Sequence, residues 1–149
     1  MVSTKRETVK ILFKSIVTRL ANDGSIEFPA RLRQVVQDEL YDLLGNHILT
    51  DQDLHERTLQ KIGASAEAVQ DAQLADSPQY RTARSIVRKG FGDDELNGFY
   101  FQKTLKSLAD QMAAYFMRSS HVDDVFETDE ELGRQIVEEI KRFNPDRAH

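Results

Sequence analysis

Apolar residues in the first part of the chain return at the spacing of a regular helix. Between residues 9 and 20 they stand three and four positions apart, which places them on one face of a helix with 3.6 residues per turn. Because such a face must be buried against another apolar surface, this pattern limits the fold more than any other feature of the sequence. The stripe consists of Val9, Leu12, Phe13, Ile16, Val17 and Leu20.

Similar stripes occupy residues 32–44, 54–62, 105–116 and 132–143. They predict one all-α domain over residues 1–149, a compact bundle of six or seven helices. We expect a weaker helix over residues 65–75 and a long helical segment from residue 94 to 116 that Gly98 bends or breaks early. The expected core is Leu12, Ile16, Leu20, Leu32, Val36, Leu40, Leu105, Leu108, Met112, Phe116, Leu132, Ile136 and Ile140.

Local signals mark several helix ends. Gly24 can take the left-handed conformation that ends a helix. Thr50 with Asp53, and Thr128 with Glu131, have the spacing of capping boxes that begin helices. Ser77-Pro78 combines a capping residue with a proline suited to the first helical turn.

Composition excludes several classes of protein. The chain has no cysteine, so a disulfide framework, a thiolate zinc site and a thiol nucleophile are excluded. No stretch approaches the roughly 18 apolar residues of a membrane span, and no signal-peptide pattern is present. These features favour a cytoplasmic protein that does not enter membranes.

Charge is unevenly distributed along the chain. The net charge of −5 argues against a dedicated DNA-coating role. Residues 1–19 hold five basic side chains against Glu7 alone, whereas residues 121–140 hold eight acidic ones against Arg134 alone. Two interpretations stay open: two solvated helix faces of opposite charge, or complementary ends that meet each other or a partner.

The first and last parts of the chain resemble each other. Residues 8–63 and 94–144 each contain a helix, a short alternating stretch and a second helix, with connecting helices over residues 64–93. A true duplication predicts that Ile26–Phe28 and Val122–Phe126 pair as a small antiparallel ribbon, held by packing of Phe28 and Phe126 against the helices. The alternative is that two amphipathic helix pairs look alike by pattern alone.

Together with residues 44–51 and 91–101, this helix–link–helix pattern resembles the bacterial domain-of-unknown-function family 507. The resemblance covers most of the chain, and the chain departs from short family members by holding two apparent copies of the unit. It implies a helical bacterial cytosolic protein and carries over no activity.

No constellation of residues indicates a cofactor or a metal. His47 and His55 stand eight positions apart without the short fixed spacing of zinc ligands. Asp51-Gln52-Asp53 and Asp123-Asp124 lack the glycine and terminal glutamate of a calcium loop. We therefore expect no metal and no cofactor, and an enzyme using dispersed carboxylates with His47 or His121 is the weakest of three functional hypotheses.

The segment from residue 81 to 106 combines arginines with aromatic residues, a composition typical of protein interfaces and of single-stranded nucleic acid sites. The leading hypothesis is a non-enzymatic protein-interaction module, an adaptor or regulatory subunit that binds an unidentified protein and is free to form homo-oligomers. Nucleic-acid binding through residues 5–19 and 81–106 is the second hypothesis. In a third interpretation of the segment, its aromatic residues are core and its arginines pair with Asp93, Asp94 and Glu95. The candidate interaction surface is Arg81, Arg84, Arg88, Lys89, Phe91, Phe99 and Tyr100.

Overall fold

The structure is a computed structural model that describes residues 4–63 and 77–147. The described residues are mostly helical, with six α-helices and two small antiparallel sheets. The helix expected over residues 65–75 lies outside the described residues. The α-helices are α1 (Arg6–Asn22), α2 (Arg33–Leu44), α3 (Asp51–Ile62), α5 (Pro78–Lys89), α6 (Leu105–Arg118) and α7 (Asp129–Arg142). The strands are β1 (Ile26–Glu27), β2 (Ile48–Thr50), β3 (Asp94–Leu96), β4 (Phe99–Phe101) and β5 (Asp124–Val125), and the 3₁₀ turns are η1 (Ala30–Leu32), η2 (Gly45–His47) and η4 (Pro145–Arg147).

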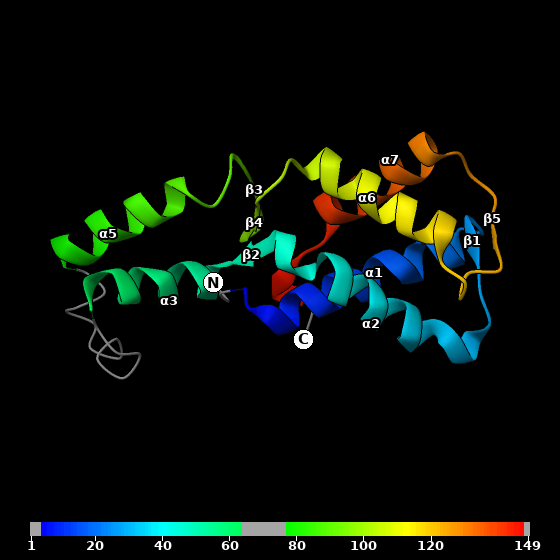
Figure 1. Ribbon diagram of the computed structural model, residues 1–149, viewed down its shortest axis with the longest axis horizontal. Helices are drawn as coiled ribbons and strands as arrows, with labels where there is room; N and C mark the ends of the chain where they lie inside the picture. The colour runs from blue at the N-terminus through cyan, green and yellow to red at the C-terminus, as the bar shows by residue number, and fades with distance from the viewer. Residues whose placement is uncertain (1–3, 64–76, 148–149) are drawn as a thin grey trace.

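Four helices form the larger part of the molecule, which we call the body. Helices α1, α2, α6 and α7 lie together in Figure 1 and enclose one apolar core. Most of the expected core residues are buried there, whereas Leu32 and Leu105 are only half-buried. Phe13, on the same face of α1 as Leu12 and Ile16, is one of the largest fully buried side chains.

The two alternating stretches contain the shorter sheet. Strands β1 and β5 run antiparallel, with Ile26 opposite Val125 and Glu27 opposite Asp124. Phe28 packs half-buried against the core. The expectation that Phe126 packs against the helices is wrong, because 59% of its surface is exposed. The ribbon is therefore anchored by Ile26, Phe28 and Val125.

Residues 94–101 form a β-hairpin, so the long helix expected from residue 94 is wrong and α6 begins only at Leu105. The turn residues Asn97 and Gly98 have φ angles of 54° and 83°, as a two-residue hairpin turn with two positive φ angles requires. Strand β4 also pairs with β2 on its other side, which gives the sheet order β2-β4-β3. A helix could not replace this arrangement, because buried β4 exchanges backbone hydrogen bonds with a partner on each side.

Helices α3 and α5 extend away from the body as a pair, which we call the arm (Figure 1). They pack against each other, and α3 begins directly after β2. As expected, α3 begins at the Thr50–Asp53 capping box, and Ser77 caps α5. A small second cluster at the root of the arm consists of Leu49, Leu54, Phe91 and Tyr100, with Val87 half-buried beside it.

Candidate functional site

Helix α5 carries one charge sign. Its twelve residues include four basic side chains and no acidic one. Arg81, Arg84 and Arg88 follow at helical spacing, so they lie along one side of the helix. Arg81, Arg84 and Lys89 are exposed, whereas Arg88 is half-buried. The basic part of the candidate interaction surface is therefore at the surface of the arm.

The fourth cation, Arg88, holds the β-hairpin against α5. Its guanidinium donates to the carbonyl oxygen of Gly92 at 2.8 Å and to the carboxylate of Glu95 at 3.1 Å. It also lies 4.8 Å from the centre of the Tyr100 ring, within the range of a cation–π contact. Arg88 therefore stabilises the root of the arm, and a substitution there changes structure as well as surface charge.

The aromatic part of the candidate interaction surface is buried. Phe91, Phe99 and Tyr100 are at most 3% exposed, so they belong to the core and offer no surface to a partner. The Tyr100 hydroxyl donates to the carboxylate of Asp51 at 2.7 Å. Burial raises the pKa of Tyr100, and the hydrogen bond to Asp51 and its negative charge raise it further. The sequence pattern could not show that Phe99 and Tyr100 are buried, because a short strand buried on both faces does not alternate polar and apolar residues.

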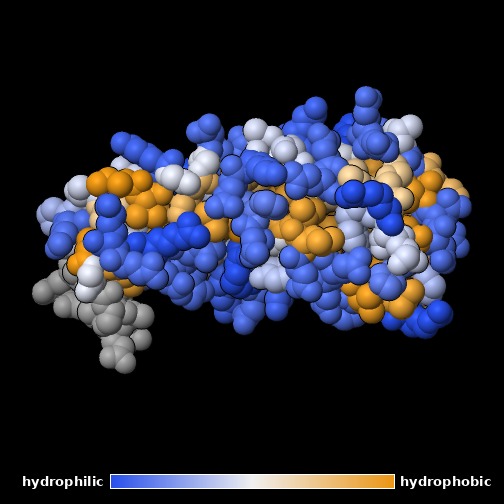
Figure 2. Space-filling view, in the orientation of Figure 1, coloured by the Kyte–Doolittle hydropathy of each residue, from blue (hydrophilic) through white to orange (hydrophobic). Residues whose placement is uncertain are grey.

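One exposed apolar residue lies on a different side of α5 from Arg84 and Arg88. Ile86 is 50% exposed and lies with Ile62 of α3 and Ala83 in a shallow hollow between the two helices. Sequence reasoning did not single out Ile86, because it shares the apolar pattern of α5 with buried Ala83. Helix α5 therefore presents an apolar contact on a different side from its arginines. Figure 2 shows such apolar areas on this face of the molecule separated by hydrophilic side chains.

The basic residues of the first segment are mostly used within the chain. Arg6 donates to the carbonyl of Gly45 at 3.0 Å and lies 3.4 Å from the carboxylate of Asp53. Arg19 of α1 pairs with Glu138 of α7 at 2.9 Å. The basic beginning and the acidic end of the chain therefore meet each other at this pair, as one of the two interpretations of the charge pattern expects.

Glu139 is the one charged residue of the described chain that is buried. Its carboxylate accepts hydrogen bonds from Ser15 at 2.5 Å and Arg142 at 2.6 Å, and Arg19 lies 3.7 Å away. Both carboxylate oxygens are thus occupied by partners within the chain. This geometry ties α7 to α1.

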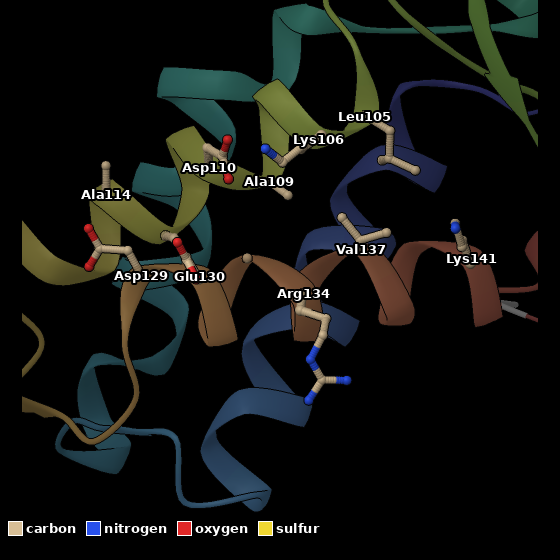
Figure 3. Close-up of a pocket in the computed structure, with 12 residues that line it drawn as sticks. Leu105, Lys106, Ala109, Asp110, Ala114, Asp129, Glu130, Arg134, Val137 and Lys141 are labelled. Carbon is tan, nitrogen blue, oxygen red and sulfur yellow. The ribbon is translucent and has the colours of Figure 1, made fainter.

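A groove of about 840 Å³ runs along α6 and α7. Figure 3 shows its lining, with Leu105 and Val137 toward one end and Ala114 toward the other. Ala109, Ala113 and Gly133 line the same groove, so the floor is made of short side chains. Five charged residues without an ion pair among residues 4–63 and 77–147 line it as well: Lys106, Asp110, Asp129, Glu130 and Lys141.

The model of the family described as protein of unknown function (DUF507) matches residues 3–147 of this chain. The chain belongs to the DUF507 family. No curated protein and no solved structure matches it. The DUF507 match covers body and arm alike, so both are parts of the family unit.

Two further observations concern the described part of this DUF507 protein. No helix there is long and apolar enough to cross a membrane. No group of three histidine, aspartate or glutamate side chains lies close enough to hold a metal ion within residues 4–63 and 77–147. His121 has one acidic neighbour, Glu39, with 3.4 Å between the ring Nε2 and the carboxylate.

Proposed function

We propose that this DUF507 protein is a non-enzymatic protein-interaction module, an adaptor or regulatory subunit of the bacterial cytoplasm. The observation that carries the proposal is the charge of α5: four basic side chains and no acidic one, on a projecting arm of a chain with net charge −5. A cationic helix face on this arm fits an acidic partner surface.

The same geometry favours a protein partner over a nucleic acid. Binding of single strands relies on exposed aromatic side chains that stack on bases, and Phe91, Phe99 and Tyr100 are buried. The second basic stripe, residues 5–19, is partly neutralised by Arg6–Asp53 and Arg19–Glu138. Because phosphate binding depends on the number of free cations, this pairing lowers the charge that a nucleic acid would meet.

The enzyme hypothesis has less support than the protein-interaction hypothesis or the nucleic-acid hypothesis. The α6–α7 groove is lined by no histidine, and the buried carboxylate of Glu139 is held by Ser15 and Arg142.

We keep the internal duplication as a proposal. Helix α1, strand β1 and helix α2 follow one another as do α6, β5 and α7, and β1 pairs with β5 between the two units. This antiparallel pairing is what an approximate twofold axis between two equivalent units would produce. In this proposal the body arose by duplication, and α5, which follows the first unit, supplies half of the arm.

The test of the interaction proposal is a pull-down from the native host with the tagged protein, with and without nuclease, read by mass spectrometry. The variant Arg84→Glu/Lys89→Glu reverses two exposed cations and leaves Arg88 in place. Its matched control, Lys14→Glu/Lys103→Glu, makes the same change of charge at exposed positions outside α5.

We expect a protein partner that survives nuclease, is retained by the control and is lost by the α5 variant. Equal capture by both variants would remove α5 from the proposal. Capture that disappears with nuclease would place nucleic-acid binding first.

A further inference from the structure

The groove between α6 and α7 has opposite charges at its two ends. Lys106 begins α6 and Lys141 ends α7, and because the two helices run antiparallel these cations share one end of the groove. Asp129 and Glu130 begin α7 at the other end, and Asp110 lies between the two ends (Figure 3).

Helix dipoles explain only part of this separation. Acidic residues are favoured at the start of a helix and basic residues at its end, which accounts for Asp129, Glu130 and Lys141. Lys106 departs from that rule, because it places a cation in the first turn of α6. Lys106 therefore destabilises the isolated chain slightly. It also places a second cation, beside Lys141, at one end of the groove.

None of these five charges has a partner within the described chain, whereas Arg134 in the same groove pairs with Glu131 and, at 2.5 Å, with Glu138. The positive charge of Arg134 is thus offset locally, and the net pattern of the groove is basic at one end and acidic at the other. A surface with this pattern is complementary to itself when it is turned end to end.

Short side chains line the floor of the groove, where α6 packs against α7. Ala109, Ala113 and Gly133 are buried there, and none of them has a side chain larger than a methyl group. Half-buried Leu105 and Val137 supply apolar contact beside them. Gly133 itself is closely covered, since an added Cβ would lie 3.3 Å from the Asp110 carboxylate.

We propose that the occupant of this groove is a second copy of the same chain. The two copies form a twofold-symmetric dimer in which their α6–α7 pairs pack antiparallel. Lys106 and Lys141 of each copy then face Asp129 and Glu130 of the other, so both pairs of ends are neutralised at once. This inference goes beyond the proposed partner of α5 and does not depend on it, because the two surfaces lie on different helices.

The test is sedimentation equilibrium of the purified full chain and of two charge-reversed variants. Lys106→Glu/Lys141→Glu makes both ends of the groove acidic, and Asp129→Lys/Glu130→Lys makes both ends basic. The control Asp38→Lys/Asp42→Lys makes the same change of charge as the second variant on exposed positions of α2. Circular dichroism of each variant establishes that it is folded before its mass is interpreted.

The wild-type chain and the control are expected to reach twice the 17.1 kDa mass of one chain at low salt. Each charge-reversed variant alone is expected to remain a monomer, and an equimolar mixture of the two is expected to recover the dimer mass. The recovery cannot come from a general loss of structure, because both members carry substitutions. A wild-type chain that remains monomeric at all concentrations, or two folded variants that do not associate when mixed, would overturn the proposal.

Discussion

The body and the arm bury their apolar residues in different ways. In the body, side chains from four helices meet in one cluster that includes Leu12, Phe13 and Ile136. In the arm, α3 and α5 have each other and the small sheet as neighbours, and the second cluster at their root contains Leu49, Leu54, Phe91 and Tyr100. Stability therefore comes mainly from the body, and the arm is the region expected to open locally at the lower free energy.

The two regions also differ in how they use arginine. Arg19 in the body pairs with carboxylates from another helix, and Arg88 at the root of the arm pairs with Glu95. On α5 itself, Arg84 and Lys89 are exposed on a helix without acids. Charge is thus balanced where elements must be held together and unbalanced on the projecting surface, which is why we place partner binding there.

The largest effect is expected from Leu12→Ala in the body. Leu12 is fully buried, so the substitution loses apolar contact and leaves a cavity in the shared core. We expect the free energy of unfolding to fall by about 3–5 kcal/mol, measured by urea denaturation. A loss of less than about 1 kcal/mol would show that the core of the body is loosely packed around Leu12.

The same substitution in the arm, Leu54→Ala, is expected to act locally. Leu54 is also fully buried, but it belongs to the smaller cluster. The expected result is faster amide hydrogen exchange in α3 and α5, with protection in α1, α2, α6 and α7 retained and a global loss smaller than that of Leu12→Ala. Equal loss of protection in body and arm would mean that the two regions unfold as one unit.

Gly98→Ala tests the hairpin that joins the two regions. Gly98 has φ 83°, and an added Cβ would lie 2.8 Å from the side chains of Thr4 and Asp51. Gly24→Ala is the matched control, because Gly24 has φ 74° but no atom within 4 Å of the added Cβ. We expect about 1 kcal/mol of destabilisation for Gly24→Ala from its backbone conformation and a larger loss for Gly98→Ala, measured by thermal denaturation. Similar losses for both would argue against close packing around the turn.

The smallest effect at neutral pH is expected from Tyr115→Phe in the body. Burial raises the pKa of Tyr115 from 10.0 to about 12. Between these two values the unfolded chain loses the proton while the folded chain keeps it, so the stability of the wild-type protein falls as pH rises through this window. Urea denaturation from pH 9 to 11.5 is expected to give a shallower decline for Tyr115→Phe. Identical slopes would show that Tyr115 is not shielded from solvent.

The positions and faces of the helices could be predicted from the sequence. The apolar stripe of residues 9–20 corresponds to the buried face of α1, and the capping signals at Thr50, Ser77 and Thr128 mark where α3, α5 and α7 begin. These predictions succeed because periodicity and capping act within one helix and need no knowledge of its neighbours. The dipeptide Asn97-Gly98 is also a local hairpin signal. It predicts a hairpin at residues 94–101 instead of the expected long helix.

The partners of each segment were decided only by the tertiary structure. Phe99 and Tyr100 are buried because β4 lies between β2 and β3, and nothing within residues 94–101 specifies that β2 is the second neighbour. Likewise, Lys106 and Lys141 share one end of a groove because α6 and α7 run antiparallel. The sequence determined which faces must be buried and where the charges lie along the chain. Which faces meet depends on packing between segments far apart in the chain, and this packing left the cations of α5 and the α6–α7 groove at the surface.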